Sequence, residues 1–351
     1  MGEIVPSAQR MSTTVGRSRS GLLGKLLGGA PNGESPGLRV YYASDVHGSQ
    51  ICWGKFLRAA PFYGADVLIM GGDLTGKAIV PIEKQPTGEL SARFLGEQRH
   101  AKGDEQSDQL LHSIRFNGFY PWIATPEEIK NMEADKQSQQ DLFETIMADD
   151  LREWIRAADA RLEGTDTRLY VMAGNDDPWS IDGVLREGKH STFCDNQVVR
   201  VGEHEMLSCG HANMTPWRAH RDLDDGALYE HLKELAEQLE NPATAIFNIH
   251  VPPYDSGLDM AVEINPGDLT PVFRSGQPHV IPVGSRAVRQ LIEEYQPLLG
   301  LHGHIHEARG EARIGRTLVL NPGSEYNTGR IHGVLVTLSS DAILGHQFVS
   351  G

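Results

Sequence analysis

Several apolar runs in this chain end in Asp, Asn or His, and this repeated pattern constrains the fold more than any other feature. The clearest run, 167–173, closes on Gly174-Asn175-Asp176-Asp177. Similar runs at 38–44, 65–70, 243–249 and 297–301 are followed by Asp45 and His47, Asp73, His250, and His304 and His306. A helical pattern over about 49–60 separates the first two runs. Buried strands alternating with helices, each strand ending in polar residues, predict an α/β fold with its site at the carboxyl edge of the sheet.

The polar residues at these strand ends are all groups that bind metals. Asp, Asn and His supply the oxygen and nitrogen ligands of divalent ions. The i, i+2 spacing of Asp45 with His47, and of His304 with His306, lets both members of a pair turn inward where a strand opens into a loop. A set this large exceeds the needs of one ion. Two ions about 3.5–4 Å apart that share a carboxylate are the usual arrangement for hydrolysing phosphate esters.

The order of these blocks resembles that of the calcineurin-like metallophosphoesterases, whose pattern is DxH, GD, GNH[DE], a lone His and GHxH. The corresponding residues here are Asp45-Val46-His47, Gly72-Asp73, Gly174-Asn175-Asp176-Asp177, His250 and Gly303-His304-Ile305-His306. The resemblance covers residues 38 to about 338. It implies a four-layer α/β/β/α sandwich of two mixed β-sheets flanked by helices. Within the family, Pro252-Pro253, 303–307 and 321–324 are most similar to the bacterial and archaeal branch of predicted phosphoesterases.

The same resemblance implies a role for each ligand. Asp45, His47 and His306 would bind a first metal, Asn175, His250 and His304 a second, and Asp73 would bridge the two. Mn, Fe, Ni and Zn are all compatible with two divalent ions in such a site. The implied activity is that of a phosphoric ester hydrolase, in which a metal-bridging hydroxide attacks phosphorus in line.

One residue departs from the family pattern, because Asp176 stands where the family has a histidine. An ionised Asp176 about 4 Å from a phosphoryl oxyanion would cost on the order of 4 kcal/mol per charge pair at an effective dielectric of 20. A monoester dianion meets this repulsion twice and a diester monoanion once, so the substitution favours diesters. Alternatively, Asp176 is held protonated and acts as a general acid, or the substitution only slows the enzyme. His211 is a candidate replacement proton donor, with an ordinary loop histidine as the alternative, and Asp177 is expected to play a supporting role.

The chain divides into a tail, a body and an insertion. Residues 1–36 are rich in Gly, Ser and Arg and predict a flexible or loosely docked tail, whereas 37–351 form the metallophosphoesterase domain. Residues from about 77 to 164 interrupt the strand–helix rhythm with a strand pair and charged helices. They predict a cap over the site, with a purely structural surface hairpin as the alternative. The strand patterns at 317–320, 333–338 and 342–349 are expected to close a second sheet.

Composition restricts the partners. The net charge is −15, from 32 basic and 47 acidic residues, which argues against a nucleic-acid groove and therefore against a nuclease. Three cysteines without CxxC spacing are typical of a reducing cytoplasm, and no apolar run is long enough for a membrane span. We expect a cytoplasmic phosphodiesterase with a small phosphate-ester substrate. The alternatives are a phosphomonoesterase of the same fold and a non-catalytic metal-binding scaffold; the oligomeric state stays open.

Overall fold

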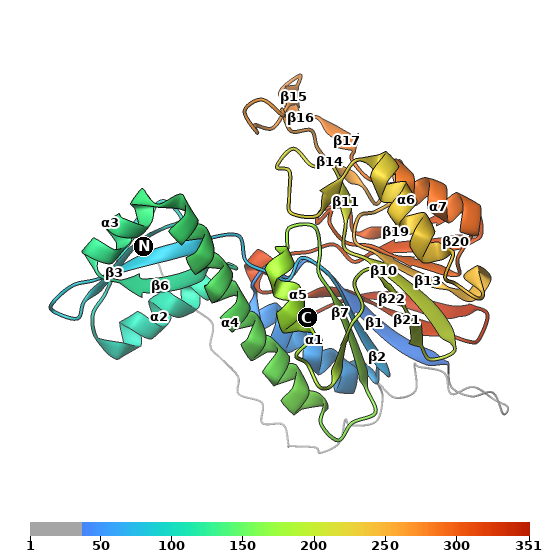
Figure 1. Ribbon diagram of the computed structural model, residues 1–351, viewed down its shortest axis with the longest axis horizontal. Coiled ribbons are helices and arrows are strands. Elements are labelled where there is room, and N and C mark those ends of the chain that lie inside the picture. The colour runs from blue at the N-terminus through green and yellow to red at the C-terminus, as the bar shows by residue number, and fades with distance from the viewer. Residues whose placement is uncertain (1–36) are drawn as a thin grey trace, which may run out of the picture. The chain divides into compact units, whose positions relative to one another are not determined.

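Two six-stranded mixed sheets form the centre of the computed structural model, which describes residues 37–351 (Figure 1). The tail predicted for 1–36 lies outside the described residues. The first sheet has the order β22 (Ile343–Ser350), β21 (His332–Leu338), β1 (Leu38–Ala43), β2 (Val67–Gly71), β7 (Arg168–Met172) and β8 (Ser191–Phe193). The second has the order β19 (Gly310–Ile314), β20 (Thr317–Asn321), β18 (Leu299–Leu301), β13 (Ile246–Ile249), β10 (His204–Cys209) and β9 (Gln197–Val201).

Alternation along the strands explains how the two sheets and their helices make four layers. In β1, Val40 and Tyr42 pack between the sheets, whereas Tyr41 and Ala43 pack on the outer face. Successive side chains of a strand point to opposite faces, so a strand buried on both sides is apolar throughout. The outer face of the first sheet is covered by α1 (Gln50–Tyr63), α4 (Lys136–Leu162) and α5 (Asp182–Leu185), and that of the second by α6 (Asp225–Ala236) and α7 (Arg286–Tyr295) (Figure 1). The predicted four-layer sandwich is confirmed.

Local signals set the helix ends close to where the sequence predicts them. The Ser49 side chain accepts a hydrogen bond from the Cys52 backbone nitrogen at 3.3 Å and caps α1. The helix ends at Gly64, whose φ of 62° is easy for glycine and costly for other residues. Ser285 caps α7 in the same way, through the Val288 nitrogen at 3.2 Å.

The last strands correct one expectation. Of the three C-terminal strand patterns, only β20 joins the second sheet. Strand β21 pairs antiparallel with β1, with Tyr41 opposite Leu335, and β22 pairs with β21. A strand pattern gives burial and period but not the pairing partner, which depends on contacts between distant segments.

The insertion has a sheet and core of its own. Its four strands have the order β5 (Glu97–Ala101), β4 (Leu90–Phe94), β3 (Ile79–Lys84) and β6 (Tyr120–Ala124), with α2 (Gly103–Phe116) and α3 (Pro126–Ala134) beside them. Its apolar cluster includes Ile82, Phe94 and Ile114. The long helix α4 then leads back to the first sheet (Figure 1). There Trp154 of α4 stacks on Trp53 of α1. The predicted strand pair is therefore part of a larger mixed sheet.

Short elements complete the described chain. They are η2 (Trp179–Ile181), β11 (Ala212–Asn213), β12 (Asp222–Leu223), η3 (Pro242–Thr244), β14 (Met260–Val262), β15 (Phe273–Arg274), β16 (Gln277–Pro278), β17 (Val280–Pro282) and η4 (Tyr326–Thr328). Among residues 37–351, no helix combines the length and apolarity that crossing a membrane requires.

Candidate metal centre

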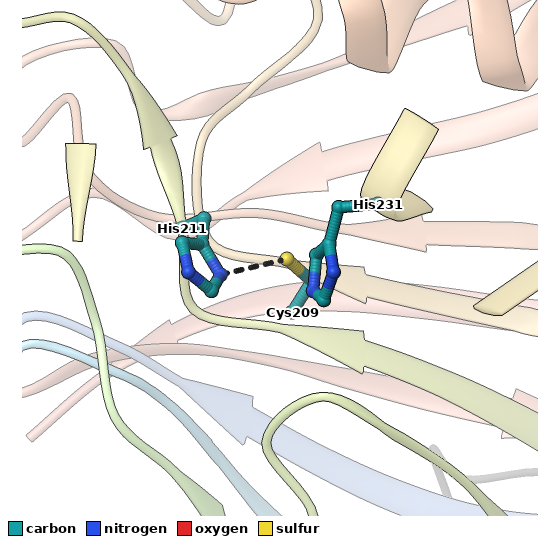
Figure 2. Close-up of side chains that lie close together, drawn as sticks. All are labelled: Cys209, His211 and His231. Carbon is teal, nitrogen blue, oxygen red and sulfur yellow. Dashed lines mark hydrogen bonds between the residues drawn. The ribbon is translucent and has the colours of Figure 1, made fainter. Parts of the chain in front are cut away.

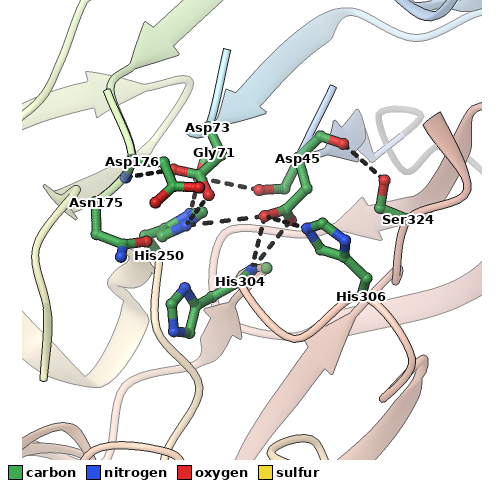
Figure 3. A network of polar contacts seen from close by, with 12 residues as sticks. Asp45, Gly71, Asp73, Asn175, Asp176, His250, His304, His306 and Ser324 are labelled. Atoms are coloured by element: carbon green, nitrogen blue, oxygen red, sulfur yellow. Dashed lines mark hydrogen bonds and ion pairs between the residues drawn. The ribbon is translucent and has the colours of Figure 1, made fainter. Parts of the chain in front are cut away.

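The carboxyl ends of strands from both sheets bring the predicted ligands together (Figure 3). Asp45 and His47 follow β1, Asp73 follows β2 and Asn175 follows β7, and these three strands are neighbours in the first sheet. His250 follows β13, and His304 and His306 follow β18, its neighbour in the second sheet. Adjacent parallel strands end at the same edge of a sheet, so residues far apart in sequence meet here.

Two groups of three side chains have the spacing of metal ligands. One is Asp45, His47 and His306, and the other is Asp73, His250 and His304; within each group the ligand atoms lie within 4.8 Å of one another. Asp73 connects the groups, because its Oδ2 lies 3.6 Å from Nε2 of His47 and 3.3 Å from Nε2 of His250. A carboxylate in contact with both groups has the position of a bridging ligand.

Neighbouring groups orient two of the side chains that would bind metal, His250 and Asn175. Nδ1 of His250 donates to the Gly71 carbonyl at 2.8 Å, which turns Nε2 towards Asp73 (Figure 3). Nδ2 of Asn175 donates to Asp222 Oδ1 at 3.0 Å, and Asn175 Oδ1 is buried with no hydrogen-bond partner among residues 37–351. Such outer contacts orient metal-binding side chains. The residues present therefore fit the two divalent ions that the fold implies.

Four of these residues have a strained backbone. Asp45, His47, Asp73 and His304 have φ values of 58°, 37°, 51° and 66°, a left-handed region that non-glycine residues seldom occupy. Strain of this kind persists where the surrounding structure imposes it, and it is typical of functional sites. Gly174 permits the close approach of Asp73, because a Cβ there would overlap the Asp73 carboxylate.

Electrostatic coupling at the centre is strong. Burial raises the pKa of Asp73 to about 6, although the charge of His250 opposes this shift. Burial disfavours the charged form of His250, yet the charge and hydrogen bond of Asp73 and the charge of Asp45 together outweigh it and raise the pKa of His250 to about 10. For Asp45, the hydrogen bond from His306 and the charges of nearby histidines overcome burial and lower the pKa. Carboxylates and imidazoles that compete so closely for protons are groups that a cation can bind.

The two consecutive aspartates of the Gly174–Asp177 turn face different ways. Asp177 is buried and accepts hydrogen bonds from the backbone of Leu74 at 3.0 Å, of Thr75 at 2.9 Å and of Gly174 at 2.8 Å. It therefore ties the loop after β2 to the loop after β7, the supporting role expected of it. Asp176 borders the pocket. Together with His47 and Asp73 it forms a third group of side chains with the spacing of metal ligands.

Two residues of this centre have no signal in the sequence. Lys77 lies in the loop after Asp73, and its Nζ is 3.4 Å from Asp176 Oδ2, with both side chains partly open to the pocket. Arg221 is fully buried and forms ion pairs with Asp182 and Asp195, the latter at 2.8 Å. Its backbone nitrogen also donates to the Asn175 carbonyl at 3.1 Å, and its Nε to the Asp177 carbonyl at 2.9 Å. In sequence, both look like ordinary basic residues of polar loops.

His211 lies elsewhere. Its ring contacts Cys209, Trp179 and His231, and it is absent from the residues that line the pocket. No contact in the described chain joins His211 to the metal-ligand groups, so its role as a proton donor stays a prediction without structural support. His302 also lies away from the ligands, because its Nδ1 contacts the Ile249 carbonyl at 2.8 Å inside the second sheet.

A pocket of about 900 Å³ opens over the centre. Its polar end contains His47, Asp73, Asn175, His304 and His306. Its other walls are largely apolar and come from several segments: Phe143 and Met147 of α4, Met214 and Trp217 of the loop after β11, and Ala261, Val262 and Ile264. A charged end with apolar walls suits an anionic group that carries organic substituents.

Comparison with known proteins agrees with this architecture. No family model matches the sequence. An uncharacterized protein of Methanocaldococcus jannaschii is 28% identical over 131 residues, which is 36% of this chain; the match spans about half of that protein, 52% of its length. One solved structure is 14% identical to this chain. The match covers 90% of this chain and 98% of the chain in that structure, with a TM-score of 0.52.

Two further solved structures are less similar. A protein of Thermus thermophilus, 14% identical, covers 90% of this chain and 98% of its own with a TM-score of 0.48. A novel archaeal phosphodiesterase is 12% identical; the match covers 89% of this chain and 99% of the phosphodiesterase, with a TM-score of 0.30. At these identities the structural likeness concerns the fold and not the activity.

The fold and the site agree with the expectation from the sequence. The chain is a sandwich of two mixed sheets flanked by helices, with His and Asp groups of metal-ligand spacing at the shared carboxyl edge of the sheets. This is the architecture implied by the resemblance of the ordered sequence blocks to those of the calcineurin-like metallophosphoesterases.

Proposed function

We propose that this protein is a dinuclear metal-dependent phosphoesterase that prefers phosphodiesters. The observation that carries the proposal is the contact of Asp73 with both metal-ligand groups, at 3.6 Å to His47 and 3.3 Å to His250. One bridging carboxylate between two sets of His and Asp ligands is an arrangement suited to phosphoryl chemistry. Mn, Fe, Ni and Zn all suit this mixture of oxygen and nitrogen ligands.

Bound divalent ions would supply Lewis acidity and a nucleophilic water at neutral pH. The protein's own residues then position the ester. The ligand end of the pocket holds the phosphoryl group, and the apolar walls from α4 and the 214–217 loop receive its organic substituents. Lys77 and Asp176 border the same space and, with Arg218 and Glu307 of the pocket lining, contribute to the charge that the ester meets.

The shape of the pocket supports the diester preference. A diester carries two organic substituents, and a pocket of about 900 Å³ with apolar walls on several sides has room for both. Asp176 adds repulsion that a monoester dianion meets more strongly than a diester monoanion. Lys77 offsets part of this repulsion and is the observation that favours the alternative, a phosphomonoesterase of the same fold.

The ester preference is tested by the rates of Mn²⁺-loaded protein on matched aryl phosphates. We expect kcat/KM for a bis-aryl diester to exceed that for the monoester with the same leaving group. Both rates should fall to background when the metal is removed with a chelator and return when Mn²⁺ is added. Faster hydrolysis of the monoester would contradict the diester preference and favour the phosphomonoesterase.

A further inference from the structure

A second group of metal-binding side chains lies outside the proposed dinuclear centre (Figure 2). It consists of Cys209 at the end of β10, His211 two residues later and His231 of α6; we call it the Cys–His–His cluster. One ligand atom from each residue lies within 4.8 Å of those of the other two. The cluster shares no residue with the groups that contain Asp45 and Asp73.

The side chains of the cluster are fixed by their surroundings. Sγ of Cys209 lies 3.5 Å from Nδ1 of His211, and the rings of His211 and His231 are 5.0 Å apart between centroids. Nε2 of His231 contacts Asn196 Oδ1 at 2.7 Å, so the other ring nitrogen is free to act as a ligand. Anchoring the second nitrogen of an imidazole by an oxygen acceptor is the usual support of a metal-binding histidine.

Burial and access both suit a bound ion. Cys209 and His211 are buried, whereas His231 is half-buried on α6, which leaves a route for an ion from solvent. The other two cysteines differ, because neither Cys52 nor Cys194 belongs to a group of metal-binding side chains within residues 37–351.

The charges nearby suit a cation. Asp195 accepts a hydrogen bond from the backbone nitrogen of Gly210 at 2.7 Å, beside Cys209. With Asp182 and Arg221 it forms a buried group that has one negative charge in excess. A divalent ion with one thiolate carries a net charge of +1, so the two groups together approach neutrality, as buried charges require.

We propose that Cys209, His211 and His231 form a third metal site, which takes Zn²⁺ or a similar thiolate-seeking divalent ion. Binding replaces the thiol proton of Cys209, which passes to solvent, and a water completes a tetrahedral set. The ion joins α6 to the end of β10, whose last carbonyl, that of Cys209, accepts the backbone hydrogen of His250 at 2.9 Å. His211 is thereby a structural metal ligand and not a catalytic proton donor.

Cobalt substitution tests the site independently of any ester hydrolysis. The ligands of the dinuclear centre are Asp, Asn and His, so a near-ultraviolet thiolate-to-Co²⁺ charge-transfer band reports on the Cys–His–His cluster alone. We expect metal-free protein titrated with Co²⁺ to develop this band fully by about three equivalents of ion, because the dinuclear centre takes up Co²⁺ as well, and added Zn²⁺ to remove it. Absence of the band when Co²⁺ saturates the protein would overturn the proposal.

Variants assign the band to its residues. Cys209→Ser is expected to abolish it, and the matched substitution Cys194→Ser, at another buried cysteine, to leave it unchanged. Should Cys209→Ser fail to fold, His231→Ala on the half-buried face of α6 provides the second variant, with loss of the band expected. A band that persists in either Cys209→Ser or His231→Ala would refute the site.

Discussion

Lys77 changes the effect that Asp176 has on the preference between monoesters and diesters. From the sequence, Asp176 is an unpaired negative charge where the family carries a histidine, and repulsion alone favours diesters. In the structure its carboxylate lies 3.4 Å from Lys77 Nζ, so the lysine offsets part of its repulsion. The lysine also borders the pocket and can donate to a phosphoryl oxygen. We therefore attribute the ester preference to this pair together with the pocket walls.

Removing Lys77 should sharpen the preference for diesters. Lys77→Met leaves Asp176 uncompensated, and we expect kcat/KM for an aryl monoester to fall about tenfold more than kcat/KM for the diester, after allowance for solvent screening. Asp176→Asn should shift the ratio in the opposite direction. Steady-state kinetics on both esters measures the effect, with Lys189→Met as the control. An equal loss on both esters would show that Lys77 does not discriminate by charge.

At the residue level, the sequence indicates which strand ends bring metal-binding side chains together, but it does not indicate their neighbours. Asp45, Asp73 and His250 follow apolar strands, and parallel strands must bring their carboxyl ends together. Lys77 and Asp222 follow no such rule. Each meets its partner only after distant loops fold together, so nothing in the local pattern distinguishes them from other charged loop residues.

Among the elements, the loop between β11 and α6 supports the centre through Arg221. The guanidinium is fully buried, pairs with Asp182 and Asp195, and donates to the backbone of Asp177 and Pro178. It also lies over the ring of Trp179 at 4.2 Å. This one side chain therefore holds the turn that presents Asn175 and Asp176.

Replacing Arg221 should destabilise the protein strongly. In Arg221→Met, Asp195 remains buried without its cation, and we expect the free energy of unfolding to fall by about 3–5 kcal/mol. The exposed pair of Arg200 with Glu240 provides the control, where Arg200→Met should cost less than about 1 kcal/mol. Urea unfolding of both variants measures the difference. Similar small losses in the two proteins would contradict the anchoring role of Arg221.

Helix α4 should give stability a specific pH dependence through Asp150. Burial raises the pKa of Asp150 to about 6 from its ordinary value of 3.8, although Arg115 opposes the shift. The folded protein thus holds this proton more tightly than the unfolded chain does. The contribution of protonated Asp150 to the free energy of unfolding falls as pH rises from about 4 to about 6. Above that range, ionised Asp150 destabilises the fold.

Asp150→Asn removes this effect and tests it. At pH 8 we expect the variant to be more stable than the parent by on the order of 1–2 kcal/mol, and the advantage to disappear near pH 4. Chemical denaturation at the two pH values provides the measurement. Asp149→Asn, on the exposed side of the same helix, should show no such change. An advantage that is the same at both pH values would exclude the Asp150 titration as its cause.

The element ends were predictable and the strand partners were not. Ser49 and Ser285 mark the starts of α1 and α7 because a hydroxyl before an apolar run caps a helix. By contrast, β21 has the same apolar pattern as β20 but pairs with β1 in the other sheet. That choice is made by packing between segments about 300 residues apart in the chain.

For the molecule as a whole, the sandwich and the insertion together make the pocket. The sandwich supplies the ligands from both sheets, and α4, which returns from the insertion, supplies Phe143 and Met147 to the walls. The sequence predicts an insertion at about 77–164 but not its four-stranded sheet. Strand β5 is mostly exposed, so it lacks the burial pattern that identifies a strand. We propose that this insertion, as a cap, determines which ester substituents fit.

The measurement that tests the dinuclear proposal most directly is diester hydrolysis by metal-free protein as Mn²⁺ is added. Mn²⁺ prefers oxygen and imidazole ligands to thiolate, so its uptake reports on the dinuclear centre and not on the Cys–His–His cluster. We predict that the rate rises until about two Mn²⁺ are bound per chain, and that Asp73→Ala abolishes both full uptake and turnover, whereas the exposed control His190→Ala behaves as the parent. Full turnover in Asp73→Ala, or two bound Mn²⁺ without hydrolysis of any ester, would contradict a dinuclear phosphoesterase.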